Sequence, residues 1–138
     1  MSWGRNKQNG VKAEGDLQTL LKEDGIFSLP MAPNIAGDLI LPLNGVVIEV
    51  KRTKGVSFFP YQPNQIEQYE KLKNYRMEEG LRVNYGILFY KNNKDSKDRD
   101  KWRFFDYKEE KYKMRKSEGV NYDSFVKDVR TRVLNFLK

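Results

Sequence analysis

The sequence predicts an α/β fold in which a mixed five-stranded sheet is flanked by helices. Two observations predict it: apolar residues recur at helical spacing near both ends of the chain, and strand-like apolar runs fill its middle. The predicted order is helix, three strands, helix, strand, strand, helix. The chain has 138 residues, the length of one domain. We therefore expect a flexible basic arm over residues 1–10, carrying Arg5 and Lys7, and a single domain over residues 11–138.

The first helix is predicted over residues 12–24, with Gly25 as its stop. Glu14 sits at the edge of the apolar stripe of this helix, where a carboxylate is costly unless it has a partner. A Glu in a first turn also suits the helix dipole. Glu14 therefore either favours its helix end or is a third carboxylate aimed at a site. The stripe itself consists of Ala13, Leu17, Leu20 and Leu21.

A short strand over Ile26–Leu29 and then a hairpin are predicted next. The hairpin strands are Leu39–Leu43 and Val46–Val50, and the intervening Asn44-Gly45 favours a two-residue type I′ turn. In the register that this turn sets, Leu41 faces Ile48, Ile40 faces Glu49 and Asp38 faces Lys51.

Alternation along these strands places Asp38, Glu49 and Lys51 together on one face of the hairpin. Opposed side chains lie about 5 Å apart and diagonal ones roughly 7 Å apart. Two carboxylates could therefore share a cation beside an ammonium group, which is the chemistry of a nuclease. Solvated charges on a half-buried strand are the ordinary alternative, but the independently favoured turn brings Asp38 beside Glu49. The opposite face, expected to be the core, carries Leu39, Leu41, Val46, Ile48 and Val50.

Residues 52–63 are predicted to be irregular, with basic and aromatic side chains interleaved. Such a segment could hold phosphates and stack on exposed bases. The aromatic residues could equally cap the core. The side chains concerned are Lys54, Phe58, Phe59 and Tyr61.

A second helix is predicted from Pro63 to about Glu79. Gln65 lies four residues before Tyr69, on adjacent helical turns. This pair could reach a phosphate, or Gln65 could be a surface amide beside a core tyrosine.

Two more strands are predicted, Val83–Tyr90 and Trp102–Tyr107, with an exposed loop over residues 92–101 between them. Asn121 is a plausible N-cap for a last helix, whose apolar stripe runs to the end of the chain. These elements complete the predicted sheet and its flanking helices.

Charge indicates the class of partner. The 26 Lys and Arg against 19 Asp and Glu give a net charge of +7, which suits a polyanion, nucleic acid before an anionic membrane. No apolar run approaches the roughly 20 residues that span a bilayer, and the N-terminus has no apolar signal region. We expect a cytoplasmic protein with no membrane partner, either nucleoid-associated or virus-encoded in a host cytoplasm.

Cysteine and histidine are both absent, which excludes disulfides, Cys/His zinc sites, thiolate nucleophiles and Ser-His-Asp triads. Hydrolysis by this chain must therefore use carboxylates, lysine, tyrosine and a hard metal. Mg²⁺ fits that oxygen-rich ligand set, and Mn²⁺ is expected to substitute for it.

The element order, with Asp and Glu-x-Lys on a central hairpin, resembles the PD-(D/E)XK nuclease superfamily with its restriction-endonuclease-like fold. Archaeal-type Holliday junction resolvases are the closer match, over roughly residues 10–107. The superfamily's Pro before the first Asp is Gly37 here, and the serine that many resolvases carry before that Asp is missing. The matching segments are Gly10 to Leu21 with Glu14, Gly37-Asp38-Leu39-Ile40, Glu49-Val50-Lys51, Tyr85 to Lys91 and Trp102-Arg103-Phe104.

The resemblance implies a homodimeric, Mg²⁺-dependent endonuclease that cleaves branched DNA and leaves a 5′-phosphate and a 3′-hydroxyl. Lys51 would orient or activate the attacking water. A RecB-like DNA-end or single-strand nuclease, which Gln65-x-x-x-Tyr69 resembles, and a catalytically silent DNA-binding module remain alternatives. The expected metal ligands are Glu14, Asp38, Glu49 and the backbone carbonyl of Val50. The expected DNA-binding residues are Arg5, Lys7, Arg52, Lys54, Tyr61 and Gln65.

Overall fold

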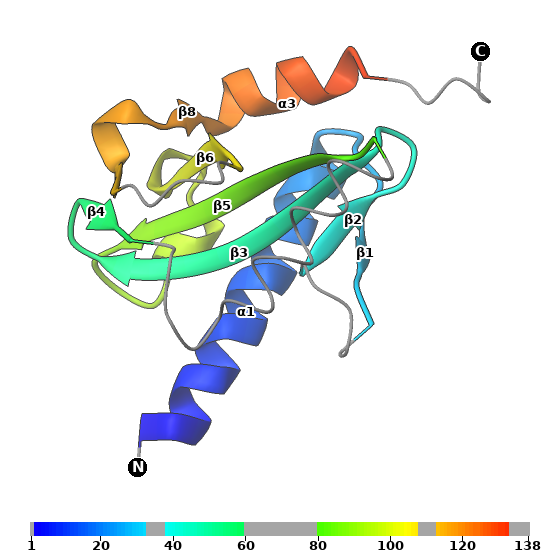
Figure 1. The fold of residues 1–138 in the computed structure, drawn as a ribbon. Helices are drawn as coiled ribbons and strands as arrows, with labels where there is room; N and C mark the ends of the chain where they lie inside the picture. Colours follow the sequence, from blue (N-terminus) through cyan, green and yellow to red (C-terminus); the bar gives the residue numbers. More distant parts are fainter. Residues whose placement is uncertain (1, 33–37, 60–79, 108–112, 133–138) are drawn as a thin grey trace.

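The computed structural model describes residues 2–32, 38–59, 80–107 and 113–132, and for residues 2–9 the backbone only. A six-stranded mixed sheet has the strand order β1-β2-β3-β5-β6-β8, and β4 and β7 form a separate two-stranded sheet (Figure 1). The strands are β1 (Leu29–Pro30), β2 (Leu39–Leu41), β3 (Val46–Lys54), β4 (Ser57–Phe58), β5 (Arg82–Tyr90), β6 (Trp102–Asp106), β7 (Met114–Arg115) and β8 (Val120–Asn121). The helices are α1 (Ser2–Glu23) and α3 (Tyr122–Arg130), with short 3-10 turns η2 (Asp95–Lys97), η3 (Arg99–Lys101) and η4 (Lys116–Glu118).

The two long strands β3 and β5 form the centre of the sheet and run parallel, while all other pairs in it are antiparallel. β5 and the first half of β3 are largely apolar and buried, as expected for strands covered on both faces. The predicted mixed α/β architecture is confirmed. The predicted count of five strands was too low, because two-residue strands such as β8 leave no alternating pattern in the sequence.

Two apolar cores lie on opposite faces of this sheet. Side chains of α1 and α3 contribute to the first core together with Ile48 and Phe104. The second core includes Val47, Tyr85 and Phe105. Alternation along β3 explains the division, since Ile48 and Val47 point to opposite faces. The predicted apolar face is confirmed: Leu39, Leu41, Val46, Ile48 and Val50 all belong to the first core.

The predicted hairpin register was wrong by two residues. Leu41 pairs with Val46 and Leu39 with Ile48, and residues 42–45 form the turn. Pro42 has no N–H to donate to a ladder, and the amides of Asn44 and Gly45 both donate to the carbonyl of Leu41, at 3.1 and 2.9 Å. A shift of two residues preserves which face each side chain occupies.

Contacts with the last helix also hold this turn. The Asn44 side-chain amide donates to the backbone carbonyls of Val129 and Arg132, at 3.1 and 2.9 Å. Gly45 has a φ of 68°, a conformation that glycine adopts without strain. The turn geometry therefore depends on a helix more than eighty residues away in the sequence.

Other boundaries also differ from the prediction. Helix α1 begins at Ser2, not at residue 12, so the backbone of the predicted arm is helical in residues 2–10; extending a helix adds a hydrogen bond for each residue fixed. The predicted strand Ile26–Leu29 is displaced to β1. The segment expected to be irregular continues β3 to Lys54 and then contains β4.

The loop over residues 92–101 is not wholly exposed, because η2 buries Asp95 and Ser96. The predicted second helix, from Pro63 to Glu79, lies outside the described residues. No helix in the described part of the chain is both long and apolar enough to cross a membrane.

Helix α3 confirms the N-cap prediction. The side chain of Asn121 accepts a hydrogen bond from the backbone N–H of Ser124 at 2.9 Å. The Phe125 ring stacks on Phe104 of β6, with centroids 3.8 Å apart and planes 5° apart. This contact packs α3 against the sheet.

Candidate active site

Asp38 is held beside the middle of β3. Its backbone N–H donates to the carbonyl of Ile48 at 3.0 Å, and its carboxylate accepts a 2.6 Å hydrogen bond from the N–H of Val50. Continuing the β2–β3 pairing by one residue places Asp38 opposite Glu49, not opposite Lys51 as the sequence predicts. The corrected register therefore brings the two carboxylates closer than expected.

Glu49 lies in the interior of the molecule, with 2% of its surface exposed. It is paired in the sheet with Tyr85 of β5, on the face of the second core. The Lys51 ammonium lies 3.4 Å from Glu49 Oε1. The sequence predicts a core only on the opposite face of β3; in the structure this face carries the second core as well, beside its charged residues.

Glu14 reaches the same group of residues from α1. Burial raises its pKa to about 7, with further contributions from the charge of Asp38 and a side-chain hydrogen bond with Asp38, while Lys51 opposes the shift. The packing of Ala13 and Leu17 against the sheet orients this part of α1. The prediction that Glu14 lies in a first turn was wrong, because α1 begins at Ser2 and Glu14 lies in its middle. The helix dipole therefore does not explain this carboxyl group, which contacts Asp38.

Burial likewise raises the pKa of Glu49, to about 8. The charge of Asp38 adds to this shift, and Lys51 reduces it. Asp38 is thus the central carboxylate, in contact with an acidic residue from α1 and another from β3. Such an arrangement is electrostatically unfavourable unless protons or a cation compensate the negative charge.

The donors suit a hard divalent cation, because all of them are oxygens. Within the described residues, no set of three or more acidic side chains forms a complete metal site. Mg²⁺ typically takes only one or two carboxylates and completes its shell with water and substrate phosphate. The adjacent Asp38 and Glu49 meet that smaller requirement.

Two of the predicted DNA-binding residues, Arg52 and Lys54, fall within the described part of the chain, both on β3. Arg52 lies on the other face of β3 from Lys51, with its guanidinium carbon 4.1 Å from the centre of the Tyr90 ring. Lys54 is exposed at the end of β3. The side chains of Arg5 and Lys7 lie outside the described residues, as do Tyr61 and Gln65.

Three further residues of the sequence analysis, Phe58, Phe59 and Val50, lie in the described part of the chain. Phe58 packs against the second core, which supports its interpretation as a core residue, whereas Phe59 is exposed. Val50 directs its side chain into the first core and its N–H to Asp38. The role of the Val50 carbonyl stays a prediction.

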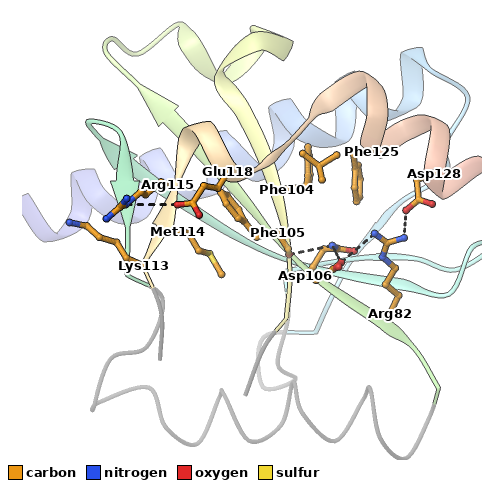
Figure 2. Close-up of a pocket in the computed structure, with 12 residues that line it drawn as sticks. Arg82, Phe104, Phe105, Asp106, Lys113, Met114, Arg115, Glu118, Phe125 and Asp128 are labelled. Carbon is orange, nitrogen blue, oxygen red and sulfur yellow. Dashed lines mark hydrogen bonds and ion pairs between the residues drawn. The ribbon is translucent and has the colours of Figure 1, made fainter. Parts of the chain in front are cut away.

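Sequence reasoning missed a cavity of about 420 Å³ beside β6. Figure 2 shows Arg82 in this cavity between Asp106 of β6 and Asp128 of α3, with both ion pairs drawn. Asn84, which is 1% exposed, also donates to Asp106, at 3.0 Å. These contacts join β5, β6 and α3. No local pattern in the sequence predicts them, because the three segments are far apart along the chain.

The chain has a restriction-endonuclease-like fold. No protein-family model and no curated protein matches its sequence.

Among solved structures, the chain is similar to Hjc, a Holliday junction resolvase from the archaeal hyperthermophile Archaeoglobus fulgidus. The TM-score is 0.62 at 20% sequence identity, and the match covers 86% of this chain and 95% of the other. The likeness confirms the predicted fold.

Proposed function

We propose that this protein is a metal-dependent DNA endonuclease that cleaves four-way junctions. The observation that carries the proposal is the group of Glu14, Asp38, Glu49 and Lys51. Asp38 interacts with both glutamates, and Lys51 lies 3.4 Å from Glu49. The same fold in a Holliday junction resolvase supports the choice of substrate.

Asp38 and Glu49, with Glu14 and the carbonyl of Val50, would hold Mg²⁺ or Mn²⁺. When bound, the metal supplies a Lewis acid and lowers the pKa of a coordinated water. Lys51 orients the attacking water and stabilises the negative charge that develops on the phosphate. The hydrogen bond from Val50 to Asp38 fixes the carboxylate for this role. Hydrolysis leaves a 5′-phosphate and a 3′-hydroxyl.

A homodimer would suit this substrate. A four-way junction presents two strands at positions related by approximate two-fold symmetry, and one chain with one site can cut only one of them. An isologous dimer supplies the second site. Sedimentation or light scattering should therefore give twice the chain mass of 16.3 kDa.

The experiment is to incubate the purified protein with a four-way junction, a linear duplex and single strands, with and without Mg²⁺. We expect cleavage of the junction in Mg²⁺ and none in EDTA. Equal cutting of linear or single-stranded DNA by a monomer would support the DNA-end nuclease instead. Tight binding to DNA without cutting in either Mg²⁺ or Mn²⁺ would support the silent binding module.

A further inference from the structure

A second polar cavity, of about 540 Å³, lies beside the small β4–β7 sheet. Four basic side chains line it, together with polar groups such as Ser57 and Asn121. None of the described residues that line this cavity is acidic. We call it the basic pocket, and its four cations are Arg103, Lys113, Arg115 and Lys116.

The backbone that forms the pocket is fixed on several sides. Ser57 pairs with Arg115 between β4 and β7, and the N–H of Lys116 donates to the carbonyl of Val56 at 2.8 Å. A Cβ on Gly119 would lie only 2.7 Å from Phe105 Cζ and 2.8 Å from Arg103 Cβ. The absence of a side chain at Gly119 therefore lets the segment after η4 lie directly on β6.

Positive charge in and around the pocket is only weakly compensated. Burial lowers the pKa of Lys116, and the nearby charges of Arg103, Lys101 and Lys91 lower it further, while Asp100 opposes them. Arg115 pairs with Glu118 at 3.8 Å, but both side chains are more than 60% exposed, and such pairs contribute little. A bound polyanion would relieve the repulsion among these cations.

Strand register connects the basic pocket with the candidate active site. Lys51 pairs with Ile87, Ile87 with Arg103, and Arg103 with Asn121, so these residues form one row across β3, β5, β6 and β8. Directly paired residues point to the same face of a sheet. With strands about 4.8 Å apart, the backbones at Lys51 and Arg103 are separated by ~10 Å.

We infer that the basic pocket binds the phosphodiester backbone of the DNA substrate next to the stretch that enters the active site. The inference rests on the proposed function and extends it, since it assigns DNA contacts to Arg103, Lys113, Arg115 and Lys116. Phosphates are the ligands because the pocket combines several cations with hydroxyl and amide groups. The pocket holds the strand without reading its base sequence.

The test measures binding of a fluorescein-labelled four-way junction by fluorescence anisotropy in EDTA, from about 50 to 200 mM KCl. The variant is Arg115→Gln/Lys116→Gln. The matched control is Lys22→Gln/Lys127→Gln, which removes the same charge from exposed positions on α1 and α3, the helices that cover the other face of the sheet. Circular dichroism melting checks that both variants fold, and Lys113→Gln/Lys116→Gln replaces the first variant if Arg115 proves necessary for the β4–β7 sheet.

We expect the pocket variant to raise the Kd of the junction about tenfold at roughly 100 mM salt, and to reduce the slope of log K against log salt by about 2. The control should stay within about twofold of the unaltered protein, with an unchanged slope. Equal affinities and slopes for the pocket variant and the control would overturn the inference.

Failure of the inference is distinguishable from failure of the proposed function. If the unaltered protein cuts junctions in Mg²⁺ while the pocket variant binds as well as the control, only the pocket assignment is wrong. If the unaltered protein never cuts, but the pocket variant loses affinity as expected, the pocket assignment stands and the nuclease function does not. A protein that binds no DNA in EDTA overturns the pocket assignment.

Discussion

Helix α1 carries carboxylates into two clusters with opposite electrostatics. At Glu14, burial and the charge of Asp38 raise the pKa of the carboxyl group. At Asp24, directly after the same helix, a hydrogen bond from the Tyr122 hydroxyl lowers the pKa, with Arg99 contributing. The first cluster places three carboxyl groups beside the ammonium group of Lys51, whereas the second supplies the Asp24 carboxylate with donors from Tyr122 and Arg99.

The contacts at Asp24 explain the difference. Its carboxylate accepts from Tyr122 Oη at 2.6 Å and from Arg99 Nη2 at 3.3 Å, and these bonds join α1, η3 and α3. This cluster serves stability. In the Glu14 cluster, burial and the charge of Asp38 raise the pKa of two carboxyl groups, which is the pattern expected where a site is arranged for chemistry and not for folding. Substitutions in the Glu14 cluster should therefore change the cleavage rate, and substitutions in the Asp24 cluster should change stability.

The largest effect is expected from Asp38→Asn. Asparagine keeps an oxygen that can accept from the Val50 N–H but removes the charge that a cation needs, so junction cleavage in Mg²⁺ should fall by more than about 100-fold. The melting temperature in EDTA should stay level or rise, because a repulsive charge is lost. Junction affinity in EDTA should also be maintained. Undiminished cutting would end the proposed mechanism.

Lys51→Ala should lower the cleavage rate by about 10²–10³-fold, because the cation no longer stabilises charge on the phosphate. The measurement is single-turnover cleavage of the junction at saturating protein. Lys22→Ala, at an exposed position on α1, is the control and should leave the single-turnover rate within about twofold. A Lys51 variant as fast as this control would remove Lys51 from the site.

Glu14→Gln distinguishes the two interpretations of its position on α1. A role at the metal predicts a rate about 10–100-fold lower without unfolding. A purely structural role predicts an unchanged rate, with any effect confined to the melting temperature. Glu23→Gln, which removes a charge from the exposed end of the same helix, should cut at the normal rate.

The smallest effect, and one on stability alone, is expected from Asp24→Asn. The variant should lose about 1 kcal/mol of unfolding free energy at pH 7, measured by urea denaturation, and keep its cleavage rate. Because the folded state lowers the pKa of Asp24, this stabilisation is present above the unfolded value near 4 and is lost as the pH falls through the folded value. The difference between the two proteins should therefore shrink below about pH 4.

Tyr122→Phe should shift stability in the same direction, since it removes the donor that lowers the pKa of Asp24 most. A cleavage rate that falls with either change, in a protein that remains folded, would contradict the division between a structural and a catalytic cluster.

Local periodicity in the sequence determined the fold class and the face of the sheet on which the candidate site residues lie. Alternation along β3 placed Glu49 and Lys51 on one face and Ile48 on the other, and Asn121 marked the start of α3. The order of such segments was enough to predict the fold class, because strand and helix periods are properties of short stretches of chain.

Only the tertiary structure decided the hairpin register, the depth of Glu49 and the contact between Glu14 and Asp38. The turn at Asn44 is set partly by the carbonyls of Val129 and Arg132, which the hairpin sequence does not contain. Glu49 is buried because strands on either side and the second core surround it. The basic pocket likewise joins β4, β6 and β7. All of these depend on which distant segments meet, and that is settled by packing of the whole chain and not by the period of any one segment.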